Sequence, residues 1–218
     1  MKPTEITKRN IMFSQPMNEY LLNIGLILGR TNNYLIDTGL GSGSVKPVIE
    51  FLKDDNKPII VINTHSCWDH IWGNFVFSDN IIISSPLCRK SIDEGWDYCI
   101  AKNGNQMDGE AKKCLPNTTF NGTLYFPEDE IIIFETPGHT PCSISIYDAK
   151  DKVLYAGDNI GDTDDEIVPY IFTDDKTMLN TINIYKQYDF EICISGHNNP
   201  QPKSVLARIE AELLKRVN

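Results

Sequence analysis

Metal-binding side chains are concentrated in one short stretch of the chain, VINTHSCWDHIWGN, which spans residues 61–74. Four of them fall within six positions, in the pattern H-x-C-x-D-H: His65, Cys67, Asp69 and His70. Imidazole, thiolate and carboxylate groups are the usual protein ligands of zinc and related transition metals. The spacing therefore indicates a metal site, and it leaves open what the cysteine contributes.

The other two histidines and one aspartate occur in similar surroundings, each after an apolar run. His139 lies in TPGHT, Asp158 in LYAGDN and His197 in ISGHNN. A single histidine is more often a hydrogen-bonded or surface residue than a metal ligand, and PGHT or AGD alone is typical of a turn. Here all four histidines follow predicted strands and are accompanied by glycine or aspartate. Since strand ends hold short loops in fixed positions, we expect these side chains to converge on one metal-binding edge.

The elements that must position these residues are two groups of strands with helices attached. Apolar runs bounded by turn residues predict strands at 20–29, 33–37, 58–64, 80–84, 130–136, 142–148, 152–157 and 190–195. Apolar residues at helical spacing predict helices at 45–55, 69–77, 174–188 and 203–217. We expect Ser44 to cap the first of these helices and Asp174 to lie near the start of the third. The pattern predicts a layered α/β fold in one domain, residues 1–218, because no linker or repeat divides the chain.

Residues 86–120 interrupt this alternation, because the segment is polar and lacks an extended apolar run. It is typical of short helices and predicts a helical cap or insert, the best candidate for a lid over the metal edge. Trp96, Tyr98 and Met107 are its candidate apolar contacts with a ligand. The alternative, that these side chains only pack the insert onto the body, agrees with the sequence equally well.

Length and composition place the chain among ordinary globular proteins. It has 218 residues, 41% of them hydrophobic, which is enough to bury a core without disulfides. A formal net charge of −10 argues against nucleic acid or an anionic membrane as partner, and favours a small-molecule substrate. No signal peptide or membrane-spanning run is visible, so we expect a cytoplasmic protein with six reduced cysteines. The sequence does not indicate an oligomeric state.

Five motifs, taken in order, resemble those of the metallo-β-lactamase superfamily. They are LIDTG (35–39), THSCWDH (64–70), PGHT (137–140), AGD (156–158) and SGH (195–197). The resemblance covers about residues 20 to 200, and it is specific because HxxxDH occurs together with PGHT, GD and GH. It implies a four-layer αββα sandwich with the metal site at one edge of the two sheets, in agreement with the predicted strands and helices.

The resemblance also implies a role for each motif residue. One metal would be held by His65, Cys67 and His139. A second would be held by Asp69, His70 and His197, with Asp158 bridging the two as in glyoxalase II-like members. Asp37 would orient a loop or a ligand without touching metal, and Asp69 would also orient the attacking water and pass on a proton. Zinc is the expected metal, as one or two ions per chain, with iron or manganese as alternatives.

Cys67 departs from the histidine that the family usually has at this position, and three interpretations remain. A thiolate can replace imidazole and complete a His2Cys set that zinc accepts. Alternatively, cysteine is too short to reach a site shaped for imidazole, which leaves a mononuclear centre. In the third interpretation catalysis has been lost and Cys67 is a small buried hydrophobe.

The expected function is that of a metal-dependent hydrolase that attacks a small-molecule ester, thioester, lactone or similar bond with a metal-activated hydroxide. Superfamily members with secretion signals, added domains or basic surfaces fit this short acidic chain less well. The alternative class is a metal-binding or redox-sensing protein on the same fold without hydrolytic turnover, or a mononuclear iron oxygenase.

Overall fold

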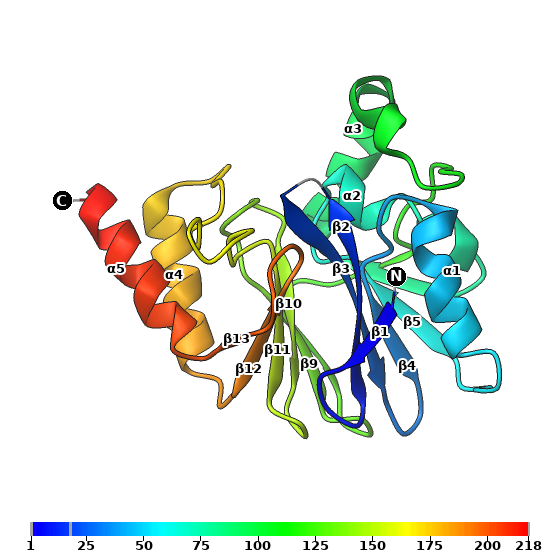
Figure 1. Ribbon diagram of the computed structural model, residues 1–218, viewed down its shortest axis with the longest axis horizontal. Coiled ribbons are helices and arrows are strands. Elements are labelled where there is room, and N and C mark those ends of the chain that lie inside the picture. Colours follow the sequence, from blue (N-terminus) through cyan, green and yellow to red (C-terminus); the bar gives the residue numbers. More distant parts are fainter. Residues whose placement is uncertain (1, 18, 218) are drawn as a thin grey trace.

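Two β-sheets pack face to face in the computed structural model, which describes residues 2–17 and 19–217 (Figure 1). The first sheet has seven strands in the spatial order β1-β2-β3-β4-β5-β6-β7. Their bounds are Lys2–Glu5, Asn10–Met17, Tyr20–Leu28, Asn33–Ile36, Ile59–Ile62, Ile81–Ser84 and Thr118–Thr119. Neighbours from β1 to β4 are antiparallel, and neighbours from β4 to β7 are parallel.

The second sheet has six strands in the spatial order β13-β12-β11-β10-β9-β8. From β8 to β13 their bounds are Thr123–Phe126, Ile131–Glu135, Ile144–Asp148, Val153–Gly157, Ile192–Ser195 and Gln201–Pro202. Strands β11 and β12 are parallel, and the other described pairs are antiparallel. Each sheet therefore comes from one continuous part of the chain, residues 2–119 for the first and 123–202 for the second.

Isoleucine-rich inner faces form the core between the sheets. Ile62 and Ile83 of the first sheet belong to the same buried cluster as Ile146 of the second. Val61 points to the opposite face of β5, where it is buried with Val45 under the outer helix. A strand covered on both faces needs apolar residues at successive positions, which explains the unbroken run of residues 59–62.

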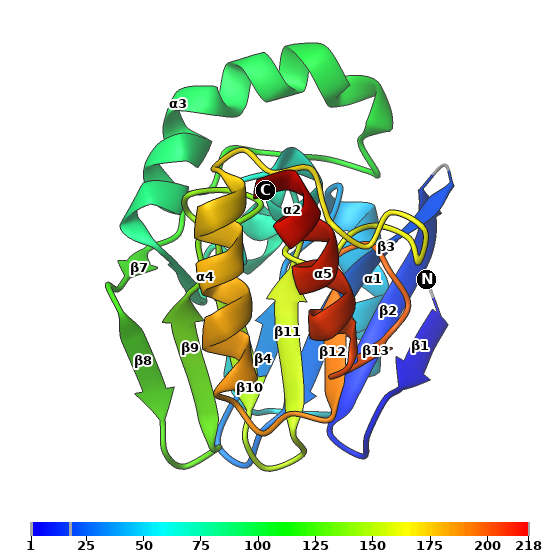
Figure 2. The ribbon, with the colours of Figure 1, turned by 90° about the vertical axis from the view of Figure 1, so that its left-hand side faces the viewer.

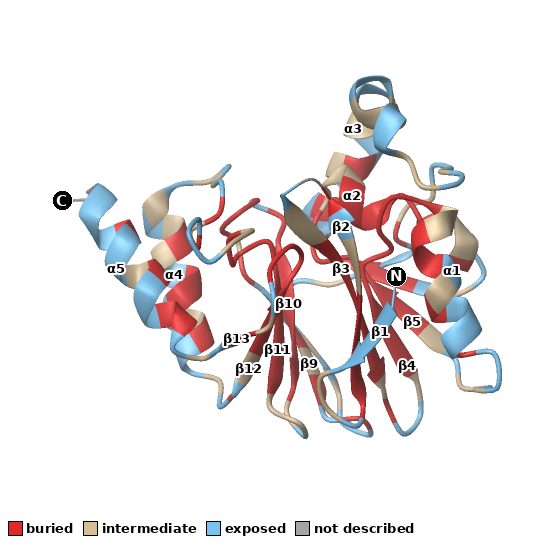
Figure 3. Ribbon diagram, in the orientation of Figure 1, coloured by how far each residue is buried: buried red, intermediate tan, exposed pale blue. Residues whose placement is uncertain are grey.

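Helices form the outer layers of the sandwich. Helix α1 (Ser42–Phe51) covers the first sheet, and α4 (Asp175–Lys186) and α5 (Val205–Val217) lie side by side over the second (Figure 2). In Figure 3 the buried residues of α1 and α4, drawn in red, lie on the sides of these helices that face the sheets. The predicted αββα sandwich is thus confirmed. No helix among residues 2–17 and 19–217 is long and apolar enough to cross a membrane.

The start of α1 differs from the sequence prediction. The helix begins at Ser42, so Ser44 lies inside its first turn and is not the cap. The N–H groups of Ser42 and Gly43 donate instead to the carbonyl oxygens of Glu110 and Asp108, at 2.9 Å each. Backbone from a distant segment therefore satisfies the free donors that a capping side chain would otherwise bind. At α4, by contrast, a side chain does cap the helix: Asp174 accepts a hydrogen bond from the Thr177 N–H at 2.7 Å.

Helices α2 and α3 and two 3-10 turns lie at the end of the sandwich where the parallel strands terminate. The expected helix over 69–77 is divided into α2 (Trp68–Ile71) and a 3-10 turn (Asn74–Phe77). In place of several short helices, residues 86–103 form the single helix α3 (Pro86–Asn103), followed by a 3-10 turn at Gly104–Gln106. Trp96 and Met107 of this segment pack against the buried cluster that contains Trp72, whereas Tyr98 is 67% exposed.

Candidate metal centre

Seven side chains converge at the end of the sandwich where the strands of both sheets deliver them. The first sheet supplies four, from the segment that follows β5: His65, Cys67, Asp69 and His70. The second supplies three, at or just after the ends of β9, β11 and β12: His139, Asp158 and His197. The structure therefore brings together all of the residues that the sequence singled out.

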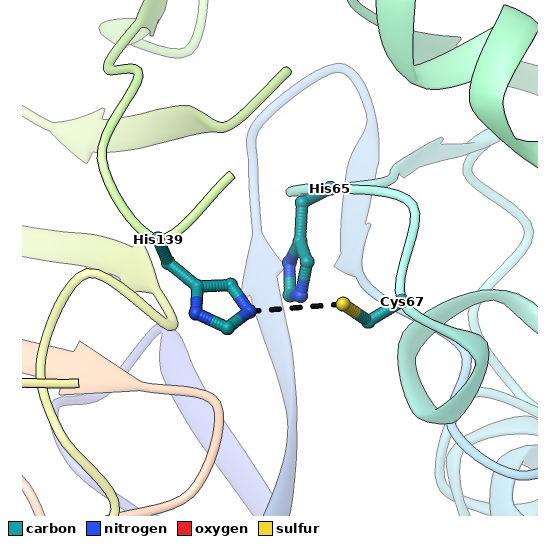
Figure 4. A group of neighbouring side chains, drawn as sticks. All are labelled: His65, Cys67 and His139. Carbon is teal, nitrogen blue, oxygen red and sulfur yellow. Dashed lines mark hydrogen bonds between the residues drawn. The ribbon is translucent and has the colours of Figure 1, made fainter. Parts of the chain in front are cut away.

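The first group of possible ligands consists of His65, Cys67 and His139. Their ligand atoms lie within 4.8 Å of one another. Figure 4 shows the two imidazoles and the thiol facing a common space, with Cys67 Sγ 3.7 Å from His139 Nε2. Cys67 is thus long enough to share this space with both histidines, and its thiol points into it.

The second group consists of Asp69, His70 and His197, all of them buried. His197 Nε2 lies 3.3 Å from Asp69 Oδ2 and 3.3 Å from His70 Nε2. The start of α2 places Asp69 and His70 at adjacent positions, and the loop after β12 brings His197 to meet them. Two imidazoles and a carboxylate in this arrangement match the donor types that zinc takes.

Asp158 lies between the two groups. Its Oδ2 is 3.3 Å from His65 Nε2 and 3.3 Å from His197 Nε2, and its Oδ1 is 3.3 Å from His70 Nε2. One carboxylate therefore contacts imidazoles of both groups. This is the position from which a single side chain can serve two neighbouring cations.

Two atoms in the centre are buried without a hydrogen-bond partner, His65 Nε2 and Asp158 Oδ1. Burying an unsatisfied polar group costs about 1–3 kcal/mol, so such atoms are uncommon in folded proteins. His65 belongs to the first group and Asp158 contacts imidazoles of both groups, and both atoms are good cation donors. The residues present therefore fit a metal ion, because a cation bound there would satisfy both atoms.

Hydrogen bonds from outside the centre fix the orientation of each imidazole. His70 Nδ1 is 2.9 Å from Asp37 Oδ2, and His65 Nδ1 is 3.0 Å from Thr64 Oγ1. Nδ1 of His139 donates to the carbonyl oxygen of Tyr170, and Nδ1 of His197 donates to that of Leu21. Each contact uses Nδ1 and leaves Nε2 facing the centre, which is how partners of metal-binding histidines select the ring orientation.

Asp37 occupies the supporting position that the sequence suggested. It accepts hydrogen bonds from the Thr64 N–H at 2.8 Å and the Thr64 hydroxyl at 2.7 Å, in addition to its contact with His70. Its backbone φ is 61°, in the left-handed region that non-glycine residues seldom adopt. The buried side chain thus joins the loop after β4 to both the His65 and the His70 segments.

Carboxylates and imidazoles in the centre shift one another's pKa values. Burial opposes ionisation of Asp158, but His70, His197 and His65 hold its pKa well below the ordinary range. Burial also disfavours charge on His70 and His197, yet Asp158 and Asp69 outweigh it and raise the pKa of both. The negative charge of Asp158 and positive charge on His70 and His197 therefore stabilise one another within the centre.

Cys67 and His139 respond differently. Burial lowers the pKa of His139, which keeps the imidazole neutral and able to donate its lone pair. Burial also raises the pKa of the Cys67 thiol, and the neighbouring carboxylates Asp69 and Asp158 raise it further. A thiolate at this position consequently needs a cation beside it, since a bound metal deprotonates a coordinating thiol.

Gly196 is a further requirement of the centre that the sequence analysis did not identify. A Cβ atom at this position would lie 2.2 Å from Asp158 Oδ1 and 2.6 Å from His70 Cε1. Only glycine allows the chain to pass this close to both groups. The SGH motif contained the signal, but the reason for its glycine depends on contacts with residues distant in sequence.

Aromatic side chains surround the mouth of the centre. The Phe172 ring lies 5.3 Å from that of His139 and 4.7 Å from that of Tyr170. Phe172 and Tyr170 are 62% and 74% exposed. On the other side, the Tyr20 ring lies 5.1 Å from the His197 ring. These residues were not predicted, because their sequence surroundings contain no metal-binding pattern.

Comparison with known proteins assigns the family. The model of the metallo-beta-lactamase superfamily matches residues 18–197, and the chain belongs to this superfamily. The solved structure of the metallo-beta-lactamase DIM-1 is similar over 99% of this chain and 97% of its own, at 15% identity and a TM-score of 0.78. TMB-1 is similar over 100% and 98% of the two chains, at 15% identity and a TM-score of 0.77. A metallo beta lactamase from Erythrobacter litoralis is similar over 98% of this chain and 96% of its own, at 14% identity and a TM-score of 0.76. At these identities the likeness concerns the fold.

Proposed function

We propose that the protein is a metal-dependent hydrolase that cleaves an ester, thioester, lactone or similar bond of a small molecule. The observation that carries this proposal is the convergence of seven donor side chains around two orphaned atoms, His65 Nε2 and Asp158 Oδ1. Membership of the metallo-beta-lactamase superfamily supports it.

Two zinc ions fit the donor chemistry best. The first would be held by His65, Cys67 and His139, the second by Asp69, His70 and His197, with Asp158 shared between them. When bound, zinc lowers the pKa of a coordinated water to near neutrality and polarises the bond that is attacked. Ligation by Cys67 is the preferred interpretation because its thiol lies 3.7 Å from His139 Nε2 and faces the same space as His65.

Asp69 is the residue best placed to handle protons. Burial opposes its ionisation, but His70 and His197 lower its pKa, so it is a carboxylate at neutral pH. It is only 7% exposed, which limits its exchange with bulk water. We assign it the transfer of the proton from the attacking water to the leaving group through its carboxylate oxygens.

Substrate recognition is assigned to the exposed aromatic pair Tyr170 and Phe172. Large exposed aromatic side chains beside a site commonly mark a ligand-binding surface. The carbonyl oxygen of Tyr170 accepts from His139 Nδ1, and the Phe172 N–H donates to the carbonyl oxygen of His139 at 2.8 Å. An apolar part of the substrate bound on these rings would therefore lie next to the first group of ligands.

A binding or redox-sensing role without turnover is the second candidate. It is favoured by one observation, the presence of an oxidisable thiol at Cys67 within the first group. A small-molecule partner, the absence of nucleic-acid and membrane partners, and a cytoplasmic location remain predictions from the sequence.

The deciding experiment measures metal content and turnover on the same preparation. The chain is stripped with a chelator, reloaded with zinc, manganese or iron(II), and analysed for ions bound per chain. Each form is then assayed against matched chromogenic esters, thioesters, lactones and phosphodiesters. A cyclic amide is included, since one similar solved structure is of DIM-1 exposed to ceftazidime.

Zinc-dependent hydrolysis of any carbonyl substrate, lost on chelation and restored on reloading, is the expected result. Tight metal binding without turnover of any substrate would favour the second candidate. If the chain binds less than one ion of zinc, of manganese and of iron(II), both candidate functions are overturned.

A further inference from the structure

Two of the six cysteines meet at the base of α3. Cys88 lies in the first turn of this helix, and Cys142 lies in the loop that leads from His139 to β10. Both are buried, at 0% and 3% exposure, and both belong to the apolar cluster around Trp72. The two segments are 54 positions apart in the sequence, so the fold alone brings these thiols together.

The backbones that carry the two cysteines are joined by one hydroxyl group. Ser85 Oγ donates to the Cys142 carbonyl oxygen at 2.8 Å and accepts from the Cys88 N–H at 3.2 Å. One hydroxyl oxygen is therefore bonded to both main chains, which places the backbones of Cys88 and Cys142 next to each other.

Cys142 is the reachable member of the pair. It lines a surface cavity of about 270 Å³ together with Pro86, Leu87 and Pro141. The neighbouring Cys88 lowers the pKa of Cys142 to about 5 although burial opposes this, and contacts with Ser66 and Thr140 act in the same direction as Cys88. Thiolates rather than thiols attack disulfides, so Cys142 is the nucleophile of the pair and Cys88 the resolving thiol.

We propose that Cys88 and Cys142 form a redox-active dithiol that is oxidised by a low-molecular-weight disulfide such as oxidised glutathione. The Cys142 thiolate attacks one sulfur of the small disulfide, forms a mixed disulfide and releases one thiolate. The Cys88 thiol then gives its proton to solvent, and the resulting thiolate attacks Cys142 Sγ and expels the second thiolate. Two protein thiols become one intramolecular disulfide, and the small disulfide is reduced to two thiols.

The bond would link α3 to the loop that holds His139, only three residues before Cys142. This modification site is separate from the metal ligands and does not depend on hydrolytic activity. The competing interpretation is that both residues are inert buried hydrophobes, for which free cysteine is well suited. The two interpretations make different predictions for the folded protein: a redox-active Cys142 reacts with a small disulfide from solvent, and an inert Cys142 does not.

Peptide mapping of the folded chain tests the proposal. The chelator-treated, full-length protein is incubated with oxidised glutathione, alkylated, and cleaved on the amino side of aspartate. This cleavage places every cysteine in its own peptide, with Cys88 in residues 79–92 and Cys142 in residues 129–147. We expect the wild type to lose two titratable thiols and to yield a linked pair of these two peptides, which dithiothreitol separates again.

Variants identify the order of attack. Cys88→Ala should accumulate glutathione on peptide 129–147, because the resolving thiol is absent. Cys142→Ala should carry no glutathione on peptide 79–92. Cys193→Ala, which removes a buried thiol from the core beneath α4 and α5, should form the linked pair like the wild type. Circular dichroism checks that each variant is folded.

The proposal is overturned if the linked peptides form only in urea, or if folded wild type takes glutathione solely on another cysteine such as Cys67 or Cys99. It is equally overturned if Cys88→Ala is folded and Cys142 remains unmodified.

Discussion

Cys67 has two opposing properties as a metal ligand. Burial and two nearby carboxylates raise the pKa of its thiol, so the protonated form is the stable one in the absence of a cation. A cation shared with His65 and His139 reverses this preference, because the thiolate is then the best donor of the three. Metal binding at the first group should consequently release a proton that a histidine at this position would not release.

The variants Cys67→Ala and Cys67→His test whether Cys67 binds a metal or only fills space as a buried side chain. We expect Cys67→Ala to bind about half as much zinc as the wild type, because the first group loses a donor while the second keeps its three. Cys67→His should retain the wild-type stoichiometry and release fewer protons on zinc binding. Calorimetric titration in buffers of different ionisation enthalpy measures both quantities. Equal zinc content in Cys67→Ala and the wild type would show that Cys67 is not a ligand.

Asp37→Asn tests the support of His70. The substitution preserves shape but removes the negative charge that faces His70 Nδ1 at 2.9 Å. Residues that orient a metal-bound histidine typically contribute about 10- to 100-fold in metal affinity, so we expect a loss of this size at the second group, which Asp37 contacts directly through His70. Competition against a chromophoric zinc chelator gives the affinity. Asp97→Asn, at an exposed position of α3, is the control and should bind like the wild type.

Strand ends explain why so much of the centre could be predicted from the sequence. The histidines of THSCWDH, PGHT and SGH each follow an apolar strand, and parallel or neighbouring strands bring their ends to one edge. What could not be predicted depends on contacts between distant segments. The backbone of residues 108–110 replaces Ser44 as the cap of α1. Residues 86–103 form one continuous helix, α3, and its Trp96 packs against a buried cluster of the body.

The close packing of the loop after β12 can be tested by substituting Gly196. Gly196→Ala places a methyl group 2.2 Å from Asp158 Oδ1, so either the loop or Asp158 must move. We expect a loss of about 1–3 kcal/mol in unfolding free energy, together with loss of zinc from the second group. Gly95→Ala is the matched control, because nothing lies within 4 Å of its added methyl group. Urea unfolding and zinc analysis of both variants decide the matter; equal zinc content would contradict the assigned role of Gly196.

The whole molecule is fastened at the end opposite the metal centre by charged groups that join the two sheets. Arg9, the residue before β2, forms a buried ion pair with Asp148 at the end of β10. Asp129, beside β9, accepts hydrogen bonds from the backbone and hydroxyl of Thr31 and from the Tyr34 hydroxyl. Both contacts cross from one sheet to the other, so they join the two sheets at the end away from the candidate metal ligands.

Asp129 should make stability depend on pH. Burial opposes its ionisation, but the hydrogen bonds from Thr31 and Tyr34 hold its pKa well below the ordinary value. A carboxyl whose pKa is lowered by folding stabilises the folded state fully above its unfolded pKa, about 3.9, and this contribution is lost as the pH falls toward the folded pKa. We expect Asp129→Asn to cost about 1–3 kcal/mol at pH 7.

Urea unfolding at a series of pH values checks this expectation. The difference between the wild type and Asp129→Asn should stay constant from pH 7 to about 5 and shrink below about pH 4. A difference that persists unchanged into strong acid would mean that the loss comes from packing and not from the charge of Asp129.

The candidate ligands are divided between the two sheets, and this has a consequence for a chain cut into two fragments. The strands before the exposed residues Asn121 and Gly122 form the first sheet, and that part of the chain carries four of the donor side chains. The strands after these residues form the second sheet, and that part carries three. A cut between these two residues would leave two fragments, neither of which holds a complete centre. A bound metal would then join donors of both fragments, and the difference in their reassociation affinity with and without zinc would measure what the metal contributes beyond the core between the sheets.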